Sequence, residues 1–381
     1  MQQQLIKSVC VLQPLIKWPW GKYTEFNYIK NLIPQYDRYV EPFFWWWGVF
    51  FRLQPEKWII NDVSSELMNL YSFVKERNIK FGSSLREYVH NREKIPKYLD
   101  VFMAKLIERY WKYKSDIISD KELASNIHQI MQKNEGLFNG LFSESFAIDN
   151  ENLLRQITKN IISKLKRTKF LEWEKGDLPL WDLEKNIETA FRSWFYMHFR
   201  DIMNFAKKYW ISKEKETANY YFIREFCYAC MFRYNDQWHF NIPYGWIAYN
   251  NKDFRKKVDY LLSADVAESF QGIEIRNEDF ENILNNNVIK ETDFVFLDPP
   301  YDTEFDDYHG NVFTKKDQER LANCLYTLNG KFLLIIKKTD FIYNLYANKP
   351  NIKIDSFEKK YLVNIKWRND QNVEHLIVYN Y

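Results

Sequence analysis

Residues 294–297 constrain the fold of this chain most strongly. All four of them, Phe-Val-Phe-Leu, are apolar, and the segment ends directly in Asp298-Pro299-Pro300-Tyr301. A short apolar run that stops at a turn is typical of a strand buried on both faces of a parallel sheet. In open α/β sheets, ligands bind beyond the carboxyl ends of the strands. We therefore expect the residues from 298 to 301 to form a ligand-facing loop.

Strand and helix signals elsewhere in the chain indicate a mixed α/β domain with a helical insertion. Strands are expected at 39–44, 58–60, 273–275, 332–336 and 376–378, and helices at 65–76, 250–262 and 314–328. From about 77 to 215, long amphipathic patterns without strand alternation predict mostly helix. Two short strand signals, 232–234 and 239–243, flank Asn235-Asp236-Gln237-Trp238 and predict a hairpin.

Length and composition narrow the class of protein. A chain of 381 residues with 46% hydrophobic and 28% charged residues is long enough for one catalytic domain with an insertion, and its composition argues against disorder. No apolar run approaches the roughly 20 residues of a membrane-spanning helix. The first four residues, Met-Gln-Gln-Gln, lack the basic start of a secretory signal. We therefore expect a cytoplasmic protein with no membrane role.

The cysteines and the net charge carry less information. Cys227 and Cys230 form a Cys-x-x-Cys pair, but no second pair or nearby histidine couple completes a zinc site. Reduced structural thiols and no metal are therefore expected. The net charge is only +3. This value does not decide for or against a nucleic-acid partner, because acidic faces can balance a basic cleft.

The loop at 298–301 carries residues suited to chemistry on an adenine amine. That amine is a poor nucleophile because its lone pair is delocalised into the ring, and acceptors such as Asp298 and the Pro299 carbonyl restore electron density to the nitrogen. Pro300 has no amide hydrogen and stiffens the loop, while Tyr301 offers a ring face to an extruded base. An ordinary strand-ending turn with a capping Asp is the alternative. Four specified residues directly after an apolar strand favour catalysis.

Through the loop at 298–301 and the amino-terminal segments described below, both ends of the chain resemble the D12, or Dam-like, class of adenine-N6 DNA methyltransferases. The resemblance implies a Rossmann-like S-adenosylmethionine-dependent methyltransferase sheet domain, formed by 1–76 and 246–381, and a mostly helical DNA-recognition insertion, 77–245. The implied activity is site-specific methyl transfer from S-adenosyl-L-methionine to a flipped adenine in double-stranded DNA, within restriction-modification or DNA protection. A cognate restriction endonuclease in the same system is left open as a partner.

Related loops occur in cytosine-N4 and protein-glutamine methyltransferases, usually with Ser or Asn in the first position. The Asp at 298 and the order of the motifs, with the cofactor loop first and the catalytic loop last, favour adenine in DNA.

Two amino-terminal segments resemble the cofactor elements of this family. Lys17-Trp18-Pro19-Trp20-Gly21-Lys22 is similar to the family's Lys-Trp-x-Gly-Gly-Lys element. Glu41-Pro42-Phe43-Phe44, followed by Trp45-Trp46-Trp47-Gly48, is similar to its Glu-Pro-Phe-x-Gly-Gly-Gly loop. Asp62, at the end of the second expected strand, is placed to accept hydrogen bonds from the cofactor's ribose, and a helix-capping Asp is the alternative. The residues assigned to the cofactor are Trp18, Lys22, Pro42, Phe43, Gly48, Asp62 and Asp298.

The segments 228–235 and 241–245 look like the family's DNA-contacting hairpin. By this resemblance, Arg233 contacts a phosphate or a guanine, and Asn235 contacts a base edge. A solvated or salt-bridged hairpin residue is the alternative for Arg233.

Tryptophan stands at family glycine positions, namely Trp20, Trp45, Trp46, Trp47 and Trp246, and also in the hairpin turn at Trp238. A cofactor loop needs positive φ and close backbone approach, which bulky residues do not allow. Glycine is also scarce, at 10 of 381 residues, against an average of about 7%. Our hypothesis is a gene that reads UGA as glycine but was translated with UGA as tryptophan. The alternative is a catalytically degenerate DNA-binding relative that cannot bind the cofactor.

Overall fold

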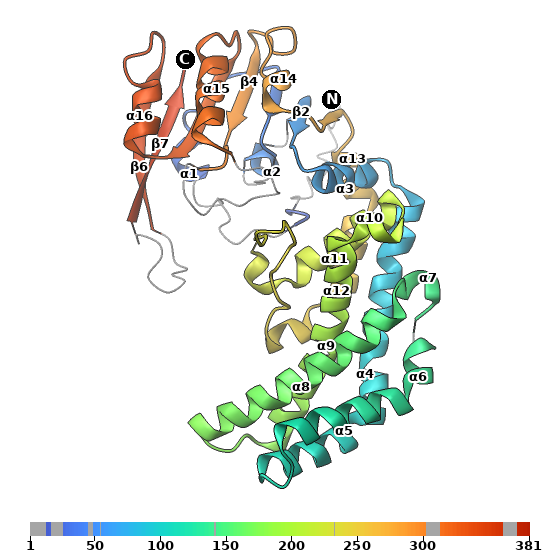
Figure 1. The fold of residues 1–381 in the computed structure, drawn as a ribbon. Coiled ribbons are helices and arrows are strands. Elements are labelled where there is room, and N and C mark those ends of the chain that lie inside the picture. Colours follow the sequence, from blue (N-terminus) through green and yellow to red (C-terminus); the bar gives the residue numbers. More distant parts are fainter. Residues whose placement is uncertain are drawn as a thin grey trace, which may run out of the picture. The chain divides into compact units, whose positions relative to one another are not determined.

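A computed structural model describes residues 13–16, 26–44, 49–53, 55–140, 142–231, 233–301, 313–360 and 372–381. The chain divides into two compact units, which are treated separately below, and Figure 1 labels their helices and strands. The sheet unit comprises Met1–Arg77, Phe232–Trp238 and Ser263–Tyr381. The helical unit comprises Asn78–Met231 and His239–Leu262.

The sheet unit is built on a seven-stranded sheet with the order β3-β2-β1-β4-β5-β7-β6. Its strands are β1 Arg38–Glu41, β2 Trp58–Asn61, β3 Ile273–Arg276, β4 Asp293–Leu297, β5 Lys331–Lys337, β6 Lys353–Lys360 and β7 Asn372–Tyr379. Strands β1 to β5 pair in parallel, whereas β7 runs antiparallel to both of its neighbours. The expected mixed α/β architecture is confirmed.

Strand β4 lies at the centre of this sheet, between β1 and β5. Every residue of β4 is buried, as expected for an apolar strand covered on both faces. Val295 is in register with Val40 of β1 and with Phe332 of β5. The prediction of a central strand buried on both faces is confirmed.

The helices of the sheet unit start at clear sequence signals. They are α1 Phe26–Ile29, α2 Phe50–Leu53, α3 Ser65–Lys75, α13 Ala264–Ser269, α14 Phe280–Ile283, α15 Lys315–Tyr326 and α16 Asp340–Tyr346. Ser64 caps α3 by accepting a hydrogen bond from the Leu67 amide at 3.3 Å. Tyr71 on the buried face of α3 packs against Phe44 and Phe270, with ring centroids 5.1 Å and 5.7 Å away. The helix predicted at 65–76 is confirmed.

The helical unit has no named strand among its described residues. Its elements are α4 Ile79–Lys114, α5 Asp120–Lys133, α6 Glu135–Asn139, α7 Glu144–Ala147, α8 Asn150–Lys175, α9 Leu180–Asn204, α10 Ala206–Tyr209, α11 Lys213–Phe226, η1 Tyr228–Cys230, η2 Ile247–Asn251 and α12 Phe254–Leu261. Helices α8 and α9 lie side by side (Figure 1). The buried Trp194 of α9 donates from Nε1 to the Leu153 carbonyl of α8 at 2.7 Å.

Helix α12 groups with the helical unit, although the sequence places residues from 246 onward in the carboxy-terminal part of the sheet domain. The reason is aromatic packing. Phe254 packs against Phe222 and Phe226 of α11, with centroid separations of 5.7 Å and 5.3 Å. The chain passes to the sheet unit at Ser263.

Of the hairpin predicted around 235–238, the turn is confirmed, and the flanking strands are reduced to single bridge residues at Tyr234 and Phe240. The turn exists, because the Trp238 amide donates to the Asn235 carbonyl at 2.8 Å. Residues 239–243, however, form no strand. Side chains of α9 bind their backbone instead: Asn204 Oδ1 accepts from the Phe240 amide at 2.8 Å, and Tyr196 donates to the Ile242 carbonyl at 2.9 Å.

Candidate functional site

The carboxyl ends of the parallel strands bring predicted site residues to one edge of the sheet. Pro42 and Phe43 follow β1, Asp62 follows β2, and Asp298 follows β4. The chain proceeds from β1 outward through β2 and β3, and then returns to the other side of β1 with β4 and β5. Such a reversal of strand order opens a crevice for a ligand at the carboxyl edge. The Asp298 loop lies beside this reversal.

The loop after β4 goes from a buried to a half-buried environment. Asp298 is 0% exposed and Pro299 is buried, whereas Pro300 and Tyr301 are half-buried. Burying a carboxylate costs free energy, and such groups gather at functional sites. The loop therefore combines a buried acid with an aromatic ring that is partly open to the surface.

Asp62 lies directly after β2 and is 6% exposed. Its Oδ1 accepts from the Ser64 amide at 2.8 Å, and burial raises the pKa of its carboxyl to about 7. The neighbouring Glu66 adds to this rise in pKa. The cap of α3 is Ser64 and not Asp62. The carboxyl of Asp62 thus sits in a turn at the sheet edge.

Asn61 holds this edge together, a role that the sequence did not reveal. Its Nδ2 donates to the Pro42 carbonyl and to the Glu278 carbonyl, each at 3.0 Å. Its Oδ1 accepts from the Glu278 amide at 2.9 Å. One side chain therefore ties together the ends of β1, β2 and β3. The only signal in the sequence is an Asn placed directly after an apolar strand.

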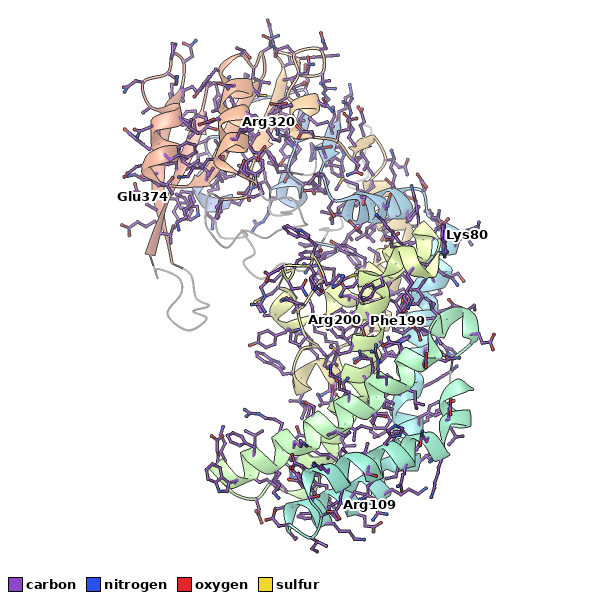
Figure 2. The ribbon with its side chains drawn as sticks, in the orientation of Figure 1. Lys80, Arg109, Phe199, Arg200, Arg320 and Glu374 are labelled. Atoms are coloured by element: carbon purple, nitrogen blue, oxygen red, sulfur yellow. The ribbon has the colours of Figure 1, made fainter. Side chains whose placement is uncertain are left out.

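An aromatic cluster lies beside Asn61 at the same edge. Phe43 contacts Phe280 of α14 and Phe313, with centroids 5.4 Å and 5.7 Å away. Arg320 of α15, labelled in Figure 2, lies over the Phe280 ring at 4.9 Å. Sequence analysis assigned only Phe43 to the site, because Phe280 and Phe313 are distant from it along the chain.

Several predicted residues lie outside the described part of the chain. They are Trp18, Trp20, Lys22, Trp45, Trp46, Trp47 and Gly48. Their assignments to the cofactor, or to recoded glycine, stay predictions.

Arg233 and Asn235, predicted to contact DNA, are both exposed in the sheet unit, Arg233 just before the 235–238 turn and Asn235 at its start. Asn235 Oδ1 accepts from the Gln237 amide at 3.1 Å, which stabilises the turn. Exposure on a tight turn is compatible with a contact to a ligand as large as a duplex.

The segment Lys337-Lys338-Thr339-Asp340 joins β5 to α16, and its contacts are structural. The Lys338 amide donates to the Glu374 carbonyl at 2.9 Å, and its Nζ lies 2.7 Å from the Glu374 carboxylate, which Figure 2 labels. Thr339 caps α16 by accepting from the Ile342 amide at 3.2 Å. The motif therefore ends β5 and starts α16.

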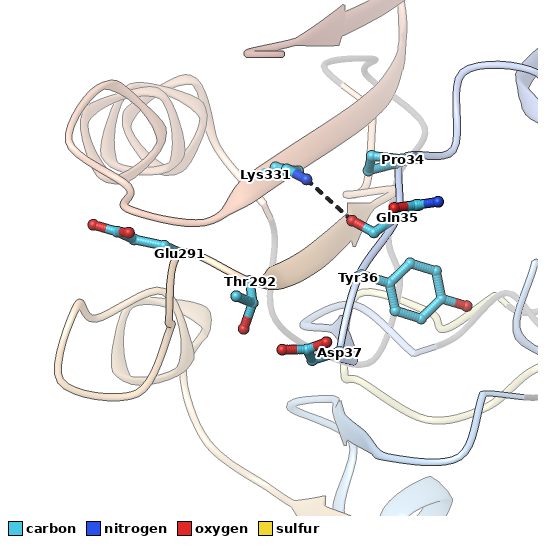
Figure 3. A pocket seen from close by; sticks show the side chains of 7 residues that line it. All are labelled: Pro34, Gln35, Tyr36, Asp37, Glu291, Thr292 and Lys331. Atoms are coloured by element: carbon cyan, nitrogen blue, oxygen red, sulfur yellow. Dashed lines mark hydrogen bonds between the residues drawn. The ribbon is translucent and has the colours of Figure 1, made fainter.

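A cavity of about 500 Å³ lies at the opposite edge of the sheet (Figure 3). Asp37, Thr292 and Lys331 line it at the amino ends of β1, β4 and β5. Lys331 Nζ donates to the Gln35 carbonyl at 3.1 Å. Because the Asp298 loop is at the carboxyl edge, this cavity is separate from the candidate site.

Two further observations concern metals and membranes. Across the described ranges, no three His, Cys, Asp or Glu side chains are grouped closely enough to hold a metal ion. Cys227 is buried and free, and burial raises the pKa of its thiol to about 12. No helix in the described part of the chain combines the length and apolarity needed to cross a membrane.

The family model of the D12 class of N6 adenine-specific DNA methyltransferases matches residues 18–172 and 138–363. These matches cover most of the chain, and the chain belongs to this family.

Similar proteins carry related names. Type II methyltransferase M1.LlaDCHI of Lactococcus lactis subsp. cremoris is 24% identical over 341 residues, which cover 87% of this chain and 82% of that protein. Type II methyltransferase M.CviBI of Paramecium bursaria Chlorella virus NC1A is 32% identical over 182 residues, 43% of this chain and 61% of the relative. Retron Ec67 DNA adenine methylase of Escherichia coli is 31% identical over 164 residues, 42% of this chain and 54% of the relative. The matched part of this chain thus spans less than two thirds of the length of the last two relatives.

Proposed function

We propose that this protein is a site-specific DNA adenine-N6 methyltransferase that takes its methyl group from S-adenosyl-L-methionine. We further propose that it acts in restriction-modification or DNA protection, with double-stranded DNA as substrate. One observation carries the proposal: the fully buried Asp298 starts an Asp-Pro-Pro-Tyr loop where the strand order reverses, in a chain of the D12 class. In this proposal the sheet unit is the Rossmann-like catalytic domain, and the helical unit is the recognition insertion.

The described residues at the carboxyl edge fit the cofactor. Asp62 offers a buried carboxyl to the adjacent hydroxyls of a ribose, and Phe43 offers an apolar ring within an aromatic cluster. Pro42 is held in place by Asn61. Trp18, Lys22 and Gly48 complete the proposed set. When bound, S-adenosylmethionine supplies an electrophilic methyl group.

The catalytic loop prepares the adenine amine. Asp298 accepts one hydrogen of the N6 amino group, and the Pro299 carbonyl accepts the other. Together these acceptors counter the delocalisation of the nitrogen lone pair and hold the amine in line for transfer. Tyr301 stacks on the base after it has left the duplex. Arg233 and Asn235 contact the DNA from this exposed segment.

Sequencing of DNA methylation tests the proposed function and also identifies the target word. Cells without adenine methylation would express the protein with glycine at 45 to 47, and their DNA would be sequenced by a method that detects N6-methyladenine. We expect methylation at one short word. Unmodified DNA, with folded protein present, would contradict the proposal.

The raised pKa of Asp62 predicts that the affinity for the cofactor depends on pH. Its pKa of about 7 means that the free carboxyl is protonated below pH 7. Ribose hydroxyls donate most strongly to the ionised form, so cofactor binding lowers this pKa. Cofactor affinity measured by calorimetry should therefore rise between pH 5.5 and 7, by up to about tenfold per pH unit, and level off above pH 7.

Two variants sharpen this test. Asp62→Asn should weaken binding and remove the pH dependence, whereas Asp265→Asn, on the exposed first turn of α13, should change neither. Burial raises the folded pKa of Asp62, so its contribution to stability is lost as the pH rises through about 7. Asp62→Asn should therefore raise the Tm at pH 8. A wild-type pH profile in Asp62→Asn would exclude the ribose contact.

Arg233 predicts a salt-dependent contribution to DNA affinity. Arg233→Ala should weaken duplex binding about tenfold, and loss of one phosphate contact should reduce the slope of log K against log salt by about 0.9. Loss of a guanine contact would instead leave the slope unchanged and relax the target word. Lys290→Ala, the same change of charge at an exposed residue before β4, is the control. Equal affinities for both variants would remove Arg233 from the interface.

A further inference from the structure

The second half of the catalytic loop is held by two elements that the proposed mechanism has not used. Gln318 of α15 donates from Nε2 to the Pro300 carbonyl at 2.9 Å. The ring of His375 on β7 lies edge to face with Tyr301, at a centroid distance of 5.6 Å and an angle of 69°. Both Gln318 and His375 are 0% exposed. The loop therefore has a polar anchor from a helix and an aromatic support from a strand.

Gln318 is a rigid anchor because the start of α15 is fixed. Thr314 and Asp317 form a reciprocal capping box, with the Thr314 amide donating to the Asp317 carboxylate at 2.8 Å. Arg320 then joins Asp317 to Asp279 and Glu281 through contacts of 2.8 Å to 2.9 Å. The donor amide is thus carried by a helix turn with bonds on both sides.

The side-chain amide of Gln318 makes one hydrogen bond although it is fully buried. Its Oε1 has no hydrogen-bond partner among the described residues, and burying such a group without a partner costs free energy. An apolar side chain of the same length would pack here without that cost. The bond to the Pro300 carbonyl is the hydrogen bond that the described structure gives this amide, so its effect falls on the loop.

The bond to Pro300 controls the carbonyl that precedes it. The proline ring fixes φ of Pro300 near −65°, which leaves ψ of Pro300 as the one soft torsion between the peptide planes before and after it, and the Gln318 donor on the Pro300 carbonyl restricts that torsion. A donor that holds the Pro300 carbonyl therefore also sets the direction of the Pro299 carbonyl. That carbonyl is the proposed acceptor for the adenine amine.

His375 continues a column of rings that supports Tyr301. Phe357 of β6 stacks on His375 at 5.4 Å and 22°, and Tyr28 of α1 stacks on Phe357 at 4.5 Å and 15°. His375 and Phe357 are direct partners in the β6–β7 register, so the sheet fixes their positions. The Tyr301 ring consequently has a rigid neighbour on one side.

We propose that Gln318 and His375 are positioning residues for methyl transfer: Gln318 directs the Pro299 carbonyl through Pro300, and His375 sets the plane of Tyr301 for stacking on the target base. This inference rests on the proposed function. Neither residue touches the reacting atoms, so both act on the placement of the target base and on the rate of transfer, and the overall affinities for DNA and cofactor stay near those of the parent.

The test uses single-turnover methylation at saturating DNA, in the full chain with glycine at 45 to 47. Gln318→Met keeps the length of the side chain and removes the donor. We expect a rate about 10-fold lower, an unchanged Tm, and DNA and cofactor affinities within twofold of the parent. Gln156→Met is the matched control, because Gln156 is also buried and donates once, to Asp201 at 2.6 Å. Its single-turnover rate should equal that of the parent.

Gln318→Glu gives a readout that a structural role would not change. A protonated Glu donates to the Pro300 carbonyl, whereas a carboxylate repels it. The rate should therefore recover toward the parent as the pH falls, while the parent shows no such recovery. A parental rate in Gln318→Met, a rate loss that only follows a lower Tm, or a parental pH profile in Gln318→Glu would each overturn the role of Gln318.

His375 is tested by the state of the flipped base. With 2-aminopurine at the target position, Tyr301 stacking quenches the fluorescence of the extruded base. His375→Ala should raise this fluorescence and lower the rate about fivefold, and His375→Phe should restore both. Parental values in His375→Ala, or no rescue by Phe, would overturn its role. A parent that binds DNA but never methylates would instead refute the proposed function, and this inference with it.

Discussion

Asp298→Ala should lower methyl transfer by about 1,000-fold or more, while DNA binding persists. The side chain is fully buried at the end of β4 and is the acceptor that we propose for the adenine amine. Removing one preorganised polar group from the reacting centre typically costs about 10² to 10³ in rate. The measurement is single-turnover transfer of labelled methyl groups to duplex DNA, with a gel-shift assay for binding.

Asp298→Asn separates the charge from the geometry. It keeps an acceptor of similar shape and should retain a small part of the rate, well above that of Asp298→Ala. Loss of the fold is monitored by Tm, which should not fall, since the Ala variant removes a buried carboxylate. A rate above one tenth of the parent in Asp298→Ala would exclude the assigned role.

Restoring glycine at 45, 46 and 47 should create cofactor affinity. With tryptophan at all three positions, we expect the cofactor loop not to allow the close backbone approach that binding needs. Calorimetry should then detect no binding of S-adenosylmethionine. The triple variant Trp45→Gly, Trp46→Gly, Trp47→Gly should bind it with a Kd of about 10 µM, a binding free energy of roughly −7 kcal/mol. No affinity in the triple variant would favour the degenerate DNA-binding relative.

Four of the described tryptophans extend this test, two at positive φ and two in the core. Trp210 caps α10 in the left-handed region at φ 48° and is 92% exposed, and Trp238 has φ 59°. Such positions favour glycine. Trp58 is 2% exposed and stacks on Phe50 with centroids 3.5 Å apart, and Trp194 is buried with its Nε1 bonded.

The codons should follow this division. We expect UGA at the family glycine positions Trp20, Trp45, Trp46, Trp47 and Trp246 and at the positive-φ residues Trp210 and Trp238. We expect UGG at Trp18, Trp58 and Trp194. UGG at 45 to 47 would contradict the recoding hypothesis. In the protein, Trp58→Gly is the matched control for the triple variant: it should cost about 3 to 5 kcal/mol of unfolding free energy and give no cofactor affinity.

Local patterns predicted much of the sheet unit. The apolar runs at 58–60 and 294–297 became β2 and β4, and the segment 65–76 became α3 with Ser64 as its cap. These predictions succeeded because burial on both faces and helix capping depend on neighbouring residues in the chain. The prediction of a strand at 239–243 failed, because α9 side chains, distant in sequence, satisfy its backbone.

By itself, the sequence predicted the Asp298-Pro299-Pro300-Tyr301 loop as the catalytic element and determined its place after a buried strand, since both depend on adjacent residues. Only the tertiary structure decided the strand order that places this loop at a reversal, the Asn61 bonds that join three strand ends, and the support from Gln318 and His375. Those contacts depend on pairings between strands and helices far apart in the chain, and no local pattern of residues encodes them.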